Sequence, residues 1–113
     1  AKCLISLRKY KLGDVVFSLK GPILATPTAS SIQIGNNMHI EDEYGAWMNH
    51  SCLGNVIVLD KNVVAIKHIP VGHELTYNYI KNETALVKPY ACFKCNTMIR
   101  GSDTVCPVYK SSY

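Results

Sequence analysis

Turn-forming residues interrupt this chain at short intervals, and this feature constrains its fold more than any other. The runs between them are brief and rich in β-branched and aromatic residues, which favour strands. No window keeps up the apolar spacing of a helix, so the pattern predicts a mostly β fold of short strands with few short helices. The turn clusters are Gly13-Asp14, Gly21-Pro22, Gly35-Asn36-Asn37, Asp60-Lys61-Asn62 and Pro70-Val71-Gly72.

Two hairpins are expected, one from Ser31–Ile34 to Met38–Ile40 and one across the turn at Asp60–Asn62. Helical turns are expected only within Glu41–Met48 and Glu83–Val87. Past Pro89 the apolar content falls, so we divide the chain into a domain over 1–88 and a cysteine-containing tail over 89–113. The predicted strands are Cys3–Leu7, Val15–Leu19, Ser31–Ile34, Met38–Ile40, Val56–Leu59, Val63–Ile66 and Leu75–Tyr79.

Composition excludes several classes of protein. The 113 residues are 48% hydrophobic and 18% charged, which is typical of a globular domain and excludes a disordered chain. The net charge of +4 is modest, so we do not expect direct binding to nucleic acid. No run of 18 apolar residues occurs, and the first 20 residues carry charges throughout, so neither a membrane span nor a signal peptide is expected.

Cysteine usage points to the cell interior. Five cysteines are an odd number with one close pair, Cys92 and Cys95, whereas a secreted disulfide scaffold more often has an even count. Thiols that are free or bound to metal are typical of a reducing compartment, so we expect a protein of the cytoplasm or nucleus. We also expect a monomer.

The segment Trp47-Met48-Asn49-His50-Ser51-Cys52 places polar, potentially reactive residues beside two apolar ones. In an extended chain His50 and Cys52 share a face, so a Cys–His nucleophile pair is one interpretation. A polar loop that ends a strand and buries Cys52 is the other. Composition alone leaves both open.

A second segment, Gly72-His73-Glu74-Leu75-Thr76-Tyr77-Asn78-Tyr79, alternates apolar and polar residues. Strand geometry would place Leu75, Tyr77 and Tyr79 on one side, with the two phenols about 7 Å apart. They could line a channel for a long, thin side chain. Alternatively, the tyrosines pack a core and leave their hydroxyls at its rim.

Taken together, the two segments resemble one known family. The pattern Asn49-His50-Ser51-Cys52-x-x-Asn55, followed by Gly72-x-Glu74-Leu75-Thr76-Tyr77-x-Tyr79, is similar to the SET-domain family of protein lysine methyltransferases. The resemblance implies a β-clip fold in which the two segments thread through one another in a knot-like active site. It also implies methyl transfer from S-adenosylmethionine to a protein lysine, histones included, with monomethylation favoured. A SET scaffold that binds a protein or peptide without catalysis is the alternative.

The resemblance assigns roles by position. Tyr79 would be the catalytic tyrosine, and Tyr77 would set how many methyl groups are added. The family usually has a Gly-x-Gly turn near the cofactor at the start of the domain, where this chain has Ala1-Lys2-Cys3. The implied cofactor-binding residues are Lys2, Cys3, Trp47, Asn49, His50 and Phe93.

A zinc site is a further implication of the resemblance. Family members with a cysteine-rich tail hold Zn²⁺ through that tail and the cysteine of the Asn-His-Ser-Cys run. Here the four thiolates would come from Cys52, Cys92, Cys95 and Cys106, and the Cys-x2-Cys spacing suits zinc. A tail that has no metal and packs Phe93 over the adenine or the substrate channel is the alternative.

Overall fold

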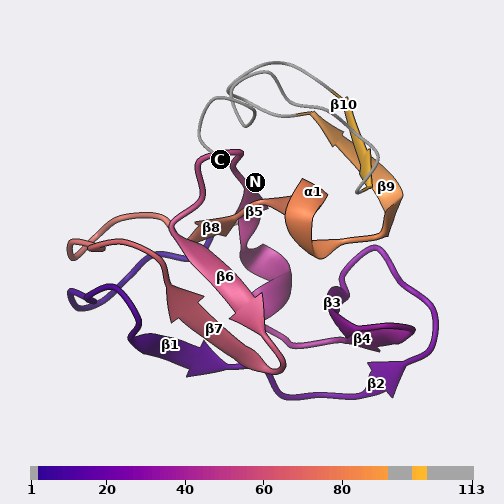
Figure 1. The fold of residues 1–113 in the computed structure, drawn as a ribbon, viewed down its shortest axis with the longest axis horizontal. Helices are drawn as coiled ribbons and strands as arrows, with labels where there is room; N and C mark the ends of the chain where they lie inside the picture. The colour runs from indigo at the N-terminus through magenta and orange to yellow at the C-terminus, as the bar shows by residue number, and fades with distance from the viewer. Residues whose placement is uncertain (1–2, 92–97, 102–113) are drawn as a thin grey trace.

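The structure, a computed structural model, describes residues 3–91 and 98–101. Within them the chain forms small sheets of short strands with one α-helical turn, which confirms the predicted mostly β fold (Figure 1). The helical turn is α1 (Tyr79–Asn82), and a 3₁₀ turn spans Gly45–Trp47. The strands are β1 (Val15–Ser18), β2 (Ile23–Leu24), β3 (Ile32–Gly35), β4 (Met38–Ile40), β5 (Asn49–His50), β6 (Val56–Leu59), β7 (Asn62–Ala65), β8 (Thr76–Tyr77), β9 (Ala85–Ala91) and β10 (Met98–Gly101).

Both predicted hairpins form. The β6–β7 hairpin turns at Asp60, which adopts φ 54°, and extends to β1 in an antiparallel sheet of order β1-β7-β6. The β3–β4 hairpin turns at Asn37 with φ 53° and continues to β2. Asn and Asp tolerate this left-handed conformation, which is why the turns could be located from the sequence.

Three predicted elements are wrong or shorter than expected. Residues Cys3–Leu7 form one isolated bridge, from Ile5 to Glu74, instead of a strand, and Leu7 is 91% exposed. The last strand stops at Tyr77, since the Asn78 side chain caps a helical turn there. The helical turn expected within Glu83–Val87 therefore comes earlier, and β9 replaces it from Ala85 onward.

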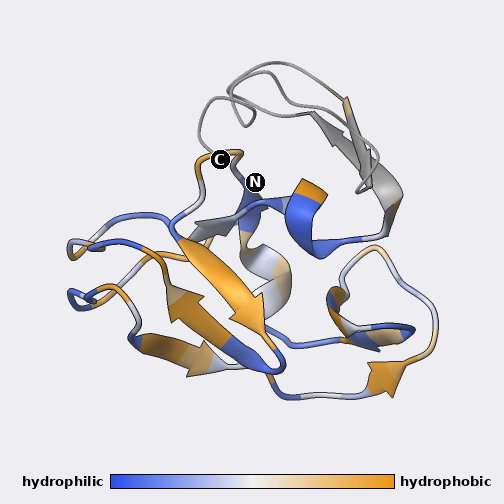
Figure 2. Cartoon of the chain, in the orientation of Figure 1, coloured by the Kyte–Doolittle hydropathy of each residue, from blue (hydrophilic) through white to orange (hydrophobic). Residues whose placement is uncertain are grey.

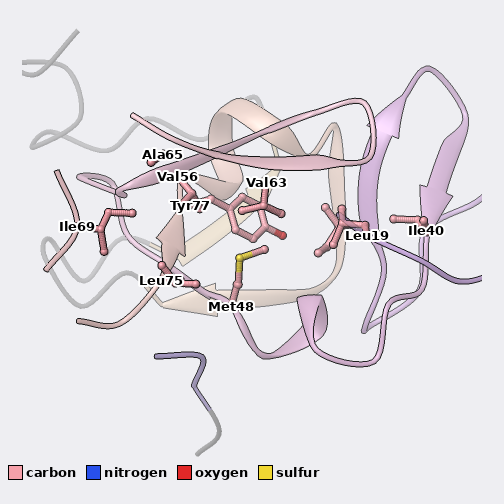
Figure 3. Packing of buried hydrophobic residues seen from close by; sticks show 10 residues of the cluster. Leu19, Ile40, Met48, Val56, Val63, Ala65, Ile69, Leu75 and Tyr77 are labelled. Atoms are coloured by element: carbon pink, nitrogen blue, oxygen red, sulfur yellow. The ribbon is translucent and has the colours of Figure 1, made fainter. Parts of the chain in front are cut away.

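One apolar core lies between the sheets and positions the segments of interest. Figure 3 shows the Met48 and Tyr77 side chains close to Val63 in its middle. Each large apolar side chain buried there contributes about 1.5–3 kcal/mol to folding, so these segments are firmly anchored. The buried cluster comprises Leu19, Ile32, Ile40, Met48, Val56, Val63, Ala65, Ile69, Leu75 and Tyr77.

Strands β9 and β10 pair antiparallel after α1. The predicted division between residues 88 and 89 falls inside β9, and it stays a prediction. Figure 2 shows the apolar residues of β1, β6 and β7 in orange. Across the described residues, no helix has the length and apolar character that crossing a membrane requires.

Candidate active site

The two sequence segments meet in space through a short parallel strand pair. Asn49 lies opposite Thr76 and His50 opposite Tyr77 in the β5–β8 ladder. The Ser51 N–H continues this ladder by donating to the Tyr77 carbonyl over 3.1 Å. The polar segment and the tyrosine segment are therefore neighbours, although turns and the β6–β7 hairpin separate them along the chain (Figure 1).

The other edge of β8 is also bonded, by Asn55. Its backbone N–H donates to the Thr76 carbonyl over 2.9 Å, and its Oδ1 accepts from the Thr76 N–H over 3.0 Å. Its Nδ2 donates to the Glu74 carbonyl over 2.8 Å. The chain from residue 49 to 55 thus loops around β8, the strand that carries Tyr77 and leads to Tyr79, as the resemblance implies.

Tyr79 lies at the start of α1 and contacts both segments. Its hydroxyl donates to the Met48 carbonyl over 2.6 Å, and its backbone N–H donates to His50 Nδ1 over 3.0 Å. Its ring centroid lies 5.2 Å from that of His50 and 4.7 Å from that of Tyr77. The two phenols are therefore closer than a continuous strand predicts, because the chain turns into a helix at Tyr79.

Tyr77 differs from Tyr79 in its surroundings. It is only 4% exposed and belongs to the apolar core, whereas Tyr79 is half-buried. Burial, with smaller contributions from the Glu83 charge and from Tyr79, raises the pKa of Tyr77 well above its ordinary value. The Tyr77 phenol is consequently neutral across the physiological pH range.

His50 is buried and uncharged at neutral pH. Its side chain is 3% exposed, and burial lowers its pKa to about 4. Acceptance of the Tyr79 N–H at Nδ1 also requires that this nitrogen carry no proton. Cys52 is fully buried, so no substrate reaches its thiol in this structure, and the interpretation as a nucleophile pair loses its support.

The remaining candidates for cofactor binding lie around this pair of strands. Asn49 is half-buried, and its Nδ2 donates to Glu74 Oε2 over 2.7 Å. Trp47 ends the 3₁₀ turn, is half-buried and contacts Tyr44 edge-on at 5.7 Å. Cys3 is exposed, and the next residue along the chain accepts a hydrogen bond from Leu75 N–H, just before β8.

Several predicted site residues lie outside the described part of the chain. They are Lys2 and Phe93 of the cofactor set and Cys92, Cys95 and Cys106 of the zinc set. Cys52 is the one zinc candidate within it, and its side chain is fully buried. Among residues 3–91 and 98–101, no three His, Cys, Asp or Glu side chains gather as a metal site would require. The zinc site stays a prediction.

The polar residues that hold α1 are not predicted from the sequence. Glu83 is 2% exposed, and its Oε2 accepts from Gln33 N–H over 2.8 Å and from Asn82 Nδ2 over 2.6 Å. Charged residues are seldom so deeply buried. Lys81, Asn82, Glu83 and Thr84 form a polar run that would usually face solvent, so no local signal could have identified Glu83.

The site thus combines neutral aromatic rings with oxygen acceptors. The neutral Tyr77 phenol, the Tyr79 phenol and an uncharged imidazole surround the β5–β8 pair, with the Met48 carbonyl and the Asn49 amide beside them. Such an arrangement suits alignment of reactants around a cation better than acid–base hydrolysis. The site is therefore that of a mostly β protein whose side chains align reactants.

Comparison with protein families matches residues 2–80 to the SET domain, which covers more than half of the chain. The chain belongs to the SET domain family. SET domains generally mark protein-lysine methyltransferases, and the family uses S-adenosylmethionine. No curated protein gives a match.

Proposed function

We propose that this protein transfers a methyl group from S-adenosylmethionine to a lysine of a protein substrate and favours monomethylation. The observation that carries the proposal is the β5–β8 pair, which holds Asn49 and His50 against the strand that leads to Tyr79. Family membership makes the reaction class the expected one. The lysine of a histone or of another protein is the proposed substrate.

The described residues fit the charge of the cofactor. S-adenosylmethionine carries a positive sulfonium, which an imidazolium would repel, and burial keeps His50 neutral. The Tyr79 oxygen and the Asn49 amide offer electron-rich atoms to that charge. We propose that Asn49 and His50 hold the cofactor, with Trp47 and Cys3 at its edge and Lys2 and Phe93 completing the set.

S-adenosylmethionine, when bound, would supply an electrophilic methyl group to the lone pair of the lysine nitrogen, and its sulfur would keep the electron pair of the bond that breaks. The amine must first lose a proton to water, because an ammonium has no lone pair. A channel lined by tyrosine rings, of which buried Tyr77 is neutral, disfavours the ammonium and so favours this loss. The role of Tyr79 is to align the amine through its hydroxyl, which the Met48 carbonyl orients.

The direct test is methyl transfer to an array of lysine peptides, including histone peptides, followed by mass spectrometry. We expect methylated products from the wild type and a drop in kcat of roughly 10- to 100-fold in Tyr79→Phe, which loses the aligning hydroxyl. Tyr10→Phe is the matched control, since Tyr10 packs at the far bridge to Ile69. Full activity of Tyr79→Phe would remove Tyr79 from the mechanism.

Tyr77 provides a second test of the same proposal. Its hydroxyl narrows the proposed channel, so we expect Tyr77→Phe to shift the products from monomethyl toward dimethyl and trimethyl lysine. The ratio of products by mass spectrometry measures this shift. An unchanged ratio in an active variant would show that another residue limits the number of methyl groups.

Cofactor binding separates the enzyme from the alternative of a non-catalytic scaffold. Cys3 carries a side chain where the family usually has a glycine close to the cofactor, and this favours the scaffold. Titration calorimetry with S-adenosylhomocysteine should give a heat of binding if the chain is an enzyme. A folded sample that gives no heat at millimolar concentration would support the scaffold instead.

A further inference from the structure

The helical turn that carries Tyr79 is too short to be stable by itself. It has only four residues, and the first turn of any helix costs more conformational entropy than its hydrogen bond returns. Within α1, Asn78 Oδ1 accepts from Ile80 N–H over 3.0 Å, and Glu83 N–H donates to the Tyr79 carbonyl over 2.8 Å. Contacts from outside must therefore fix its orientation.

Besides the Tyr79 bonds to Met48 and His50, those contacts come from Gln33 in β3, an edge strand of its sheet. The Gln33 backbone N–H donates to Glu83 Oε2 over 2.8 Å, and its carbonyl accepts from Asn82 Nδ2 over 3.0 Å. The Gln33 side-chain oxygen accepts from Thr84 N–H over 2.7 Å. The side chains of residues 82 and 83 thus bond the strand edge as a neighbouring strand would.

Glu83 is the centre of this arrangement. Its Oε2 accepts from Asn82 Nδ2 as well as from Gln33 N–H, so one buried oxygen joins both sides of the contact. A hydrogen bond to a carboxylate is stronger than one between neutral groups, and a buried donor that loses its acceptor destabilises the structure around it. Figure 1 shows α1 between the β5–β8 pair and β3.

We infer that Glu83 is a positioning residue, which fixes the Tyr79 ring by pinning α1 to Gln33 without touching either reactant. The inference rests on the proposed function for its effect on catalysis. The Tyr79 hydroxyl reaches Met48 and its N–H reaches His50 only while α1 keeps its orientation. Loss of the Glu83 carboxylate frees α1 to rotate and misplaces the phenol.

The test compares Glu83→Ala, which removes the acceptor, with Glu83→Gln, which removes the charge but keeps an oxygen that can accept both bonds. We expect kcat of Glu83→Ala to fall roughly 10- to 100-fold while the KM for S-adenosylmethionine changes little, since a misplaced group slows the chemical step. Glu83→Gln should recover most of kcat. Measurements are made well below the unfolding temperature of each variant, so that lower stability alone does not reduce the rate.

Asp14→Ala is the matched control, because the Asp14 carboxylate also accepts a backbone N–H, from Lys11 over 2.8 Å, but does so in a turn before β1. Unchanged kcat in folded Glu83→Ala, or equal loss in Glu83→Gln and Glu83→Ala, would overturn the inference. If Glu83→Ala does not fold, Gln33→Ala removes the bond from Thr84 and should show a smaller loss of the same kind.

A readout independent of activity separates this inference from the proposed function. In protein labelled with ¹³C-tyrosine, the ring resonances of Tyr79 should shift in Glu83→Ala and stay in place in Asp14→Ala. A wild type that transfers no methyl group would refute the function, yet the resonances would still decide whether Glu83 holds the ring. Unshifted resonances in an active protein would refute the positioning role alone.

Discussion

His50 illustrates how burial sets the chemistry of a single residue. Its imidazole is almost fully covered, its Nδ1 accepts the Tyr79 N–H, and its pKa falls to about 4. Protonation would place a charge in an apolar setting and remove this hydrogen bond. The local structure therefore requires a neutral His50 ring, and the binding of the proposed cationic ligand would require it as well.

This pKa predicts that acid weakens the fold. The unfolded chain binds a proton at His50 below its ordinary pKa of 6.5, whereas the folded chain does so only near pH 4. Stability should thus fall as the pH drops from 6.5 toward 4, by on the order of 1–2 kcal/mol at pH 5. Urea unfolding at pH 7 and pH 5 measures the difference.

Glu83 acts in the opposite direction and must be separated from His50. Burial raises the pKa of its carboxyl, so the folded state binds this proton more readily and acid favours it. His50→Asn, which keeps an acceptor near Nδ1, should abolish the acid-induced loss or reverse its sign. A loss of the same size in His50→Asn would show that another group causes it.

At this scale the sequence identifies residues that belong to a motif and misses those defined by tertiary contacts. Asn49, His50 and Tyr79 stand out because their types and spacing match the motif of a known family. Glu83 and Gln33 come from distant segments, and their importance follows only from burial and from the bonds between them. Such pairs have no local signature.

Among the elements, the β5–β8 pair depends on the close approach of Gly54 to the backbone of β8. A Cβ at this position would lie 2.8 Å from the Thr76 carbonyl oxygen and 2.9 Å from Tyr77 Cα, both of them backbone atoms. Backbone cannot rotate away as a flexible side chain can. Gly54 therefore allows the loop of residues 49–55 to close tightly around β8.

We predict that Gly54→Ala destabilises the protein by about 1–3 kcal/mol, the usual cost of overpacking. Gly35→Ala is the control, since a Cβ there meets only the Met38 side chain at ordinary contact distance, and we expect a change within about 0.5 kcal/mol. Urea unfolding of both variants measures the difference. Equal free energies of unfolding in the two variants would mean that the backbone around Gly54 makes room for a Cβ without loss of stability.

Hairpins were the elements that sequence predicted best. Asp60 and Asn37 mark their own turns, and the partner strands follow within a few residues. Elements defined by distant partners were predicted less well. The strand ending at Tyr77 and the two-residue strand β2 depend on neighbours elsewhere in the chain, which periodicity does not show.

For the whole molecule, the metal content tests the predicted zinc site. If Cys52, Cys92, Cys95 and Cys106 hold zinc, purified protein should contain about one zinc per chain, and removal by a chelator should lower the unfolding temperature. Elemental analysis and thermal unfolding measure the two effects. Cys52→Ser should lose the metal, while Cys3→Ser, outside the proposed ligand set, should keep it.

A metal-free preparation made without chelators would favour the alternative of a tail without zinc. Retention of zinc by Cys52→Ser would instead remove this buried thiol from the ligand set.

The loop of residues 49–55 around β8 also limits which segments of the protein can change in sequence. Thr76 and Tyr77 are bonded along both edges of their backbone, so a shift to either side would break bonds on the other. The backbone of β8, which carries Tyr77 and leads to Tyr79, is therefore held in a fixed position. New substrate preferences in this family should therefore arise more readily from segments outside residues 49–55 and β8. Libraries that randomise those segments should retain more folded members.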